Sequence, residues 1–136
     1  MKLVIDKQNF ELEFGFKVFS VLSKMWKLEG VNSIFKRVIT SMSWAMNLDF
    51  QNLKSEDFEN LDIPIESFEV LADIIGASIV ANKHNNIALE DLEAMDLENW
   101  VFLNQEEMGP IMTAFIDAMP RPKEPVDPGK RNAVKK

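Results

Sequence analysis

Residues 2–14, KLVIDKQNFELEF, alternate apolar and polar side chains on both sides of a short polar connection at residues 6–9. Leu3 and Ile5 share one face of the first run, and the same alternation resumes at Phe10. A period of two is typical of half-buried β-strands, so this stretch predicts a hairpin. A two-stranded ribbon is marginal alone in water, so its apolar face must pack against the helices that follow.

Two amphipathic helices are expected directly after the hairpin. Apolar residues recur there every three or four positions, which is the spacing of one buried helical stripe. The first helix should follow Gly15 and stop near Gly30. The second should span residues 31–46, with Asn32 or Ser33 as its N-cap.

A third helix is predicted to begin at Pro64, because proline is favoured in the first turn of a helix. The acidic stretch before it, residues 49–64, is a loop or a short helix. Gly76 and the small residues after it would permit close approach of a neighbouring helix. The predicted buried stripe of this third helix consists of Phe68, Leu71, Ile74, Ile75 and Ile79.

The C-terminal half of the domain predicts further helices with less regular spacing. Residues 88–93 begin one pattern, in which Leu89 is expected to face inward. Residues 96–103, with Trp100 and Phe102 among their apolar side chains, either continue that helix or kink away from it. Asn104 followed by Glu107 resembles a capping box and would start the last helix.

The sequence therefore predicts a mainly α protein, a small bundle of about five helices with an N-terminal β-hairpin and a disordered C-terminal tail. Residues 1–119 form the predicted domain. Residues 120–136 hold four prolines within nine positions and a basic polar end, a composition that does not bury enough apolar surface to order itself.

The net charge of −7 is unevenly distributed along the chain. From Arg121 onward there are six Lys or Arg against two acids, which gives +4 and leaves about −11 on residues 1–120. An acidic body repels nucleic acid, so no nucleic-acid partner is expected. The basic tail would either solubilise the protein or touch an acidic partner.

Catalysis, cofactors and metals are not expected from this composition. The chain has no cysteine and one histidine, His84, which lies among polar residues with no nucleophile beside it. The acids between Glu90 and Glu98 lack the glycine-centred spacing of a calcium loop. The absence of cysteine favours a reducing compartment, and neither a signal peptide nor a membrane span is predicted, so a cytoplasmic location is expected.

Eight methionines and three tryptophans are abundant for a chain of this size, and both residue types are common at binding surfaces. Most of them belong to helical stripes and are expected in the core. Trp44, Met46 and Phe50 fit a stripe least well, so they are the candidate partner-binding residues. Lys130 and Arg131 of the basic tail are added to this set.

The order of these features resembles the tail assembly chaperones of long-tailed bacteriophages that infect Gram-positive hosts. The resemblance rests on residues 2–24 (KLVIDKQNFELEFGFKVFSVLSK), 68–85 (FEVLADIIGASIVANKHN) and 87–100 (IALEDLEAMDLENW). It implies a protein of the host cytoplasm, absent from the mature virion, that binds the tape-measure protein, keeps it soluble and helps recruit tail-tube protein. It also implies a programmed ribosomal frameshift near residues 128–131 that would yield a longer product. Homo-oligomer formation is a further expectation, because a small protein has to cover a long linear client.

Two other functional classes fit an acidic helical domain. One is a DNA mimic that inhibits or regulates a protein by occupying its basic groove, which would require carboxylates at phosphate-like spacing. The other is a small structural head-tail connector, which would be found in purified particles where a chaperone would be missing.

Overall fold

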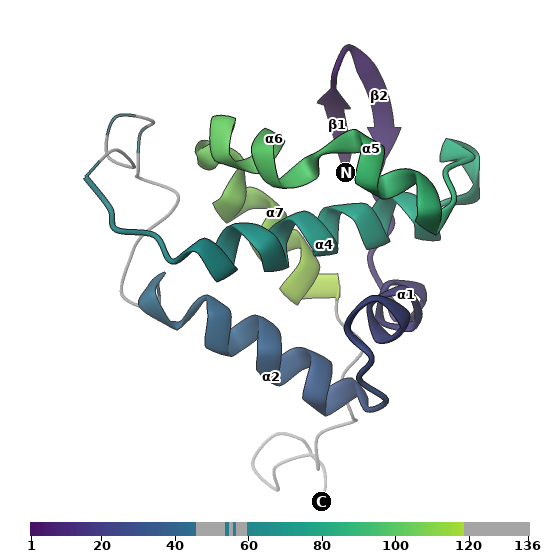
Figure 1. Ribbon diagram of the computed structural model, residues 1–136, viewed down its shortest axis with the longest axis horizontal. Coiled ribbons are helices and arrows are strands. Elements are labelled where there is room, and N and C mark those ends of the chain that lie inside the picture. The colour runs from purple at the N-terminus through teal and green to yellow at the C-terminus, as the bar shows by residue number, and fades with distance from the viewer. Residues whose placement is uncertain (46–53, 55, 57–59, 119–136) are drawn as a thin grey trace, which may run out of the picture.

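One central helix, α4 (Ile65–Ala81), organises the domain. The computed structural model describes residues 1–45, 54, 56 and 60–118, and within these the fold is mainly helical with one antiparallel hairpin. The helices α1 (Phe16–Trp26) and α2 (Val31–Ser41) lie on one side of α4, and α5 (Leu92–Met95) and α6 (Leu97–Leu103) lie on the other (Figure 1). The last helix, α7 (Met108–Ala118), packs behind α4. The predicted fold class is thus confirmed.

The hairpin pairs β1 (Lys2–Ile5) with β2 (Gln8–Glu11), with Leu3 opposite Phe10. Its turn is shorter than the predicted four-residue connection, because only Asp6 and Lys7 lie between the strands. Both have positive φ, 51° and 68°, as the type I′ turn of a tight hairpin requires.

The buried face of the hairpin sits against the C-terminal end of α4, as the sequence predicts. Leu3, Ile5 and Phe10 are buried. The backbone N–H of Glu11 donates to Asn85 Oδ1, and Asn85 Nδ2 donates back to the Glu11 carbonyl at 2.7 Å. This pair of bonds fixes the hairpin to the turn after α4.

Helix α1 ends three residues before the predicted stop at Gly30. Lys27 adopts the left-handed conformation (φ 57°) and terminates the helix, whereas Gly30 is the N-cap of α2. Neither Asn32 nor Ser33 caps α2, which has no side-chain cap and begins with the Ile34 N–H bonded to the Gly30 carbonyl. Gly30 does lie between the two helices, as predicted, but it is Lys27 that ends α1.

Replacing Lys27 with glycine is expected to stabilise the protein by about 0.5–1 kcal/mol, because glycine adopts the left-handed conformation without the steric cost of a Cβ atom. Thermal and urea unfolding would measure the change. Lys24→Gly, a matched change inside the last turn of α1, should destabilise by a similar amount. A Lys27→Gly variant that is less stable than the native protein would contradict this account of the helix end.

Helix α2 ends at Ser41, earlier than the predicted end at Met46. A single 3₁₀ turn, η1 (Ser43–Ala45), follows it. The Met42 N–H is shared among the carbonyls of the preceding turn, which is how α-helices commonly tighten at their ends. Met46 itself lies outside the described residues.

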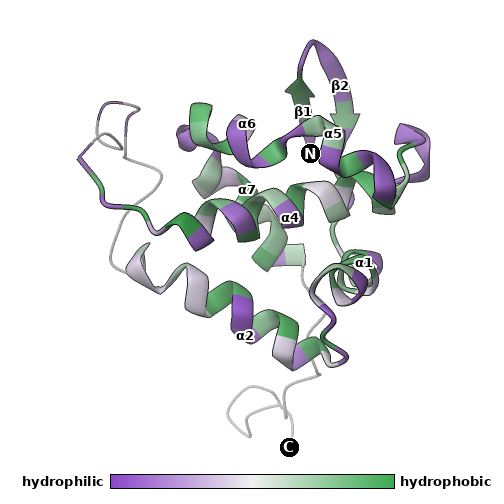
Figure 2. Cartoon of the chain, in the orientation of Figure 1, coloured by the Kyte–Doolittle hydropathy of each residue, from purple (hydrophilic) through white to green (hydrophobic). Residues whose placement is uncertain are grey.

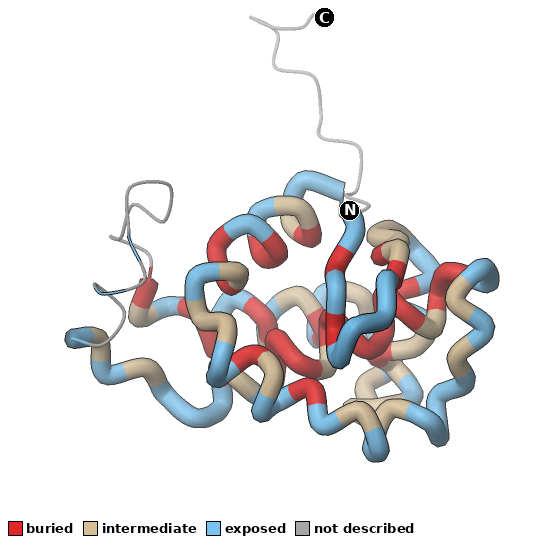
Figure 3. The backbone as a smooth tube through the Cα atoms, turned by 90° about the horizontal axis from the view of Figure 1, so that it is seen from above, coloured by how far each residue is buried: buried red, intermediate tan, exposed pale blue. Residues whose placement is uncertain are grey.

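Helix α4 is buried almost all round, although a single apolar stripe was predicted. Between Val70 and Ala81 only Asp73 and Val80 are not fully buried. Neighbours on opposite sides explain this, and Figure 3 shows the buried tube of α4 beneath the surrounding elements. Gly76 permits the predicted close approach, since a Cβ atom there would lie 2.9 Å from Leu92 Cδ1.

The segment after α4 kinks at Asp96, which settles the alternative left open by the sequence. A 3₁₀ turn, η3 (Leu89–Asp91), leads into α5, and Asp96 takes the left-handed conformation (φ 49°) before α6 begins. Leu89 is exposed, so its predicted inward orientation is wrong. The 3₁₀ geometry of η3 turns this residue away from the face that Leu92 presents to α4.

The predicted capping box at Asn104 and Glu107 is also wrong. Asn104 Nδ2 donates to the Trp100 carbonyl at 2.7 Å, so this side chain closes α6 and does not cap the next helix. A 3₁₀ turn, η4 (Gln105–Glu107), then leads into α7, with Pro110 in its first turn. Among the helices of the described ranges, none has the length and apolarity needed to cross a membrane. The predicted tail at 120–136 lies outside those ranges.

Candidate binding surface

Large apolar side chains are exposed together at the end of the domain where α4 begins and α6 ends. Ile65 is 77% exposed, Phe102 57% and Leu103 67%. The rings of Phe68 and Phe102 are 5.8 Å apart and nearly perpendicular, which joins the two helices. We call these four residues the α4–α6 apolar end; Figure 2 shows the apolar colouring there.

The antiparallel packing of α6 on α4 creates this surface. Leu97, at the start of α6, lies against Gly76, whereas Phe102, at its end, reaches Phe68 two turns earlier on α4. Leu97 and Val101 are buried and hold α6 in place. Each further helical residue rotates by about 100°, so Phe102 and Leu103 turn progressively away from α4.

The sequence identified Phe102 as one of the apolar residues of 96–103 and assigned it no orientation. Five of the seven residues of α6 are apolar, more than one buried face of a short helix accommodates. This excess was the available signal for an exposed apolar surface. The remaining large exposed apolar residues of the described ranges are distributed over other elements, where single exposed side chains are ordinary; they are Met1, Val4, Phe16, Ile39 and Leu89.

The predicted partner-binding residue Trp44 lies at the same end of α4 and is half-buried. Its Nε1 donates to Ser67 Oγ at 2.7 Å, and Ser67 Oγ donates to the Ser41 carbonyl. Trp44 therefore ties the end of α2 to the first turn of α4. The other predicted partner-binding residues, Met46, Phe50, Lys130 and Arg131, lie outside the described residues.

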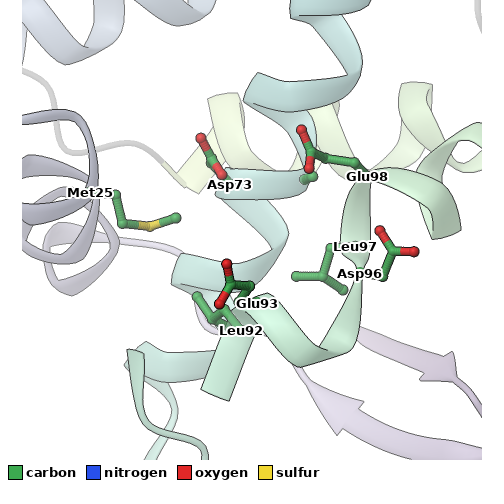
Figure 4. A pocket seen from close by; sticks show the side chains of 8 residues that line it. Met25, Asp73, Leu92, Glu93, Asp96, Leu97 and Glu98 are labelled. Carbon is green, nitrogen blue, oxygen red and sulfur yellow. The ribbon is translucent and has the colours of Figure 1, made fainter. Parts of the chain in front are cut away.

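A pocket of about 240 Å³ opens between α1, α4, α5 and α6 (Figure 4). Its lining combines apolar side chains with carboxylates and consists of Met25, Ala72, Asp73, Leu92, Glu93, Asp96, Leu97 and Glu98. Its lining holds no Ser, Thr, Lys or His side chain. In the described ranges no three His, Asp or Glu side chains are placed to share a metal ion.

Asp73 is the most constrained carboxylate of this pocket. Its Oδ2 accepts a hydrogen bond from Trp26 Nε1 at 2.7 Å. The Arg37 guanidinium lies over the Trp26 ring, 4.4 Å from its centroid, and Arg37 Nε is 3.9 Å from Glu66 Oε2. Burial raises the pKa of the Asp73 carboxyl, although the bond from Trp26 and the charge of Arg37 act in the opposite direction.

Asp73→Asn is expected to make stability less dependent on pH. The raised pKa means that the folded protein binds this proton more tightly than the unfolded chain does. The stabilisation of the folded state by protonation of Asp73 is therefore complete below the ordinary aspartate pKa of 3.8. It is lost as the pH rises through the raised pKa of the folded protein. Asparagine keeps an acceptor for Trp26 and cannot ionise, so the variant should gain stability relative to the native protein towards neutral pH.

Urea unfolding at several pH values between about 3.5 and 7 would measure this difference. Trp26→Phe removes the hydrogen bond that lowers the pKa, so it should steepen the pH dependence. A difference between Asp73→Asn and the native protein that stays constant, or shrinks towards neutral pH, would refute the assignment.

His84 is exposed in a 3₁₀ turn, η2 (Lys83–Asn85), as predicted for a solvated residue. Its backbone N–H donates to Asn82 Oδ1 at 3.0 Å. Of the acids that follow it, Asp91 has a structural role, because its Oδ2 accepts the Ala88 N–H at 2.9 Å. This bond satisfies a backbone donor at the start of η3.

Comparison with protein-family models, with curated proteins and with solved structures finds no match. Within the described chain, the α4–α6 apolar end is where several large apolar side chains are exposed on neighbouring helices.

Proposed function

We propose that the protein is a tail assembly chaperone of a long-tailed bacteriophage, which binds the tape-measure protein and keeps it soluble before the tail tube encloses it. In this role no covalent bond is made or broken. The protein would act in the host cytoplasm, help recruit tail-tube subunits and be absent from the finished virion.

The observation that carries the proposal is the α4–α6 apolar end. Phe102 and Leu103 keep most of their surface in water although the domain has a well-filled core. Exposing large apolar side chains side by side costs solubility, and such patches mark surfaces that bind other polypeptides. A tape-measure protein is a long helical chain, so its apolar faces need covering until the tube assembles around it.

The charge of the domain supports the same role. Residues 1–120 carry about −11, so complexes that cover a client with several copies would repel one another and stay dispersed. Self-association of the protein along its client is part of the proposal, because one small domain covers only a short length of an extended chain.

Co-expression with the tape-measure protein of the same phage tests the proposal directly. We expect the tape-measure protein to move from the insoluble to the soluble fraction and to co-purify with the chaperone. Mass spectrometry of purified particles should find the tape-measure protein without the chaperone. A tape-measure protein that stays insoluble and unbound, or a chaperone that is stoichiometric in virions, would refute the proposal.

A further inference from the structure

The elements that form the α4–α6 apolar end carry charge of one sign only. Residues 65–72 and 97–107 contain five acidic residues and no Lys, Arg or His. These acids are Glu66, Glu69, Glu98, Glu106 and Glu107. All except Glu107, which is half-buried, are exposed.

The asymmetry extends over the whole C-terminal part of the described chain. Residues 61–118 hold twelve acids and one lysine, Lys83, which lies at the opposite end of α4. Residues 1–45 hold seven Lys or Arg against four acids. The apolar end therefore belongs to a strongly acidic part of the chain.

The acidic side chains border the exposed apolar ones. Glu69 follows Phe68 directly on α4, and Glu98 lies one turn before Phe102 on the same face of α6. Figure 4 shows Glu98 extending from α6 beside α4. Arg37 approaches this border from α2, and its Nε is 3.9 Å from Glu66 Oε2.

We infer that the α4–α6 apolar end binds an amphipathic helix whose apolar stripe is bordered by Lys or Arg. The inference rests on the proposed function and specifies which segments of the client are recognised. Apolar side chains of the helix would cover Ile65, Phe102 and Leu103, while its basic borders meet the carboxylates around them. A symmetric contact between two copies of this chain fits the surface poorly, because it would place two acidic borders together.

Three designed peptides test this inference. They share one helical stripe of leucines and differ only in the flanking residues, which are Lys, Gln or Glu. Fluorescence anisotropy should show that the Lys peptide binds at least about tenfold more tightly than the Glu peptide, with the Gln peptide between them. The advantage of the Lys peptide should shrink as the salt concentration rises.

Charge reversal at the border supplies the matched variants. Glu69→Lys with Glu98→Lys should remove or invert the preference for the Lys peptide. Glu90→Lys with Asp117→Lys makes the same change in net charge at exposed positions outside the apolar end, and should leave most of the preference intact. Circular dichroism would confirm that both variants are folded.

The outcomes separate the inference from the proposed function. Equal affinity for the Lys and Glu peptides, or equal effects of the two double variants, would overturn the inference. It would also be overturned if no peptide binds while the tape-measure protein does, or if sedimentation shows a dimer that Phe102→Asp abolishes. Failure of the tape-measure protein itself to bind would instead refute the proposed function.

Discussion

Replacing Phe115 with alanine is expected to lower the free energy of unfolding by about 3–5 kcal/mol. Phe115 is 1% exposed, and its ring contacts Phe14 edge-on at 6.2 Å and Phe19 at 5.9 Å between centroids. It thus joins α7 to α1 and to the segment that connects β2 with α1. Since small domains are stable by about 5–15 kcal/mol, this loss would remove a large share of the stability of the protein.

Urea unfolding followed by circular dichroism would measure the change. Phe16→Ala is the matched control, because Phe16 is 68% exposed on α1 and its removal should alter stability by no more than about 0.5 kcal/mol. A Phe115→Ala variant within about 1 kcal/mol of the native protein would mean that α7 is not packed on α1 as described.

Changing Phe102 and Leu103 together to aspartate is expected to abolish most client binding while the domain stays folded. Both side chains are largely exposed, so their loss removes little core packing beyond the Phe68–Phe102 ring contact, worth about 1 kcal/mol. Binding should weaken by at least about 30-fold, because central apolar anchors commonly contribute about 2 kcal/mol or more.

Co-purification and anisotropy with the tape-measure protein would measure this loss. Phe16→Asp adds one such charge at a similarly exposed aromatic position on α1, near the other end of α4, and should bind normally. If both variants bind like the native protein, the client does not use the α4–α6 apolar end.

Much of the fold follows from local pattern. The alternation around Leu3 and Ile5 identified the hairpin, and Pro64 marked the start of α4, because these signals depend on residues close in sequence. The ends of helices were predicted less well. Lys27 and Asp96 both adopt left-handed backbone conformations although neither is a glycine, so no glycine signal marks these helix ends.

The hydrogen-bonding roles of asparagines were also beyond local reasoning. Asn104 was expected to begin a helix but closes one, and Asn85 bonds Glu11 across 74 positions of the chain. A side chain with a donor and an acceptor satisfies whichever backbone groups the tertiary fold brings near, and sequence spacing does not specify these.

None of the four residues of the α4–α6 apolar end was selected from the sequence as a binding residue. Trp44 was selected because it fits a helical stripe poorly; it is half-buried, and its bond to Ser67 connects η1 to the first turn of α4. Phe68 was assigned to a buried stripe, and Phe102 was given no orientation. A sequence pattern identifies which residues are apolar, whereas the antiparallel overlap of α6 with α4 decides which of them remain uncovered.

Hydrogen-exchange mass spectrometry of the protein with and without the tape-measure protein tests the central claim most directly. Bound client should slow exchange in the first turns of α4 and in the segment from Phe102 through η4, and should leave η2 and the hairpin turn unchanged. Slowed exchange confined to other elements, with the α4–α6 apolar end as accessible as in the free protein, would contradict the account.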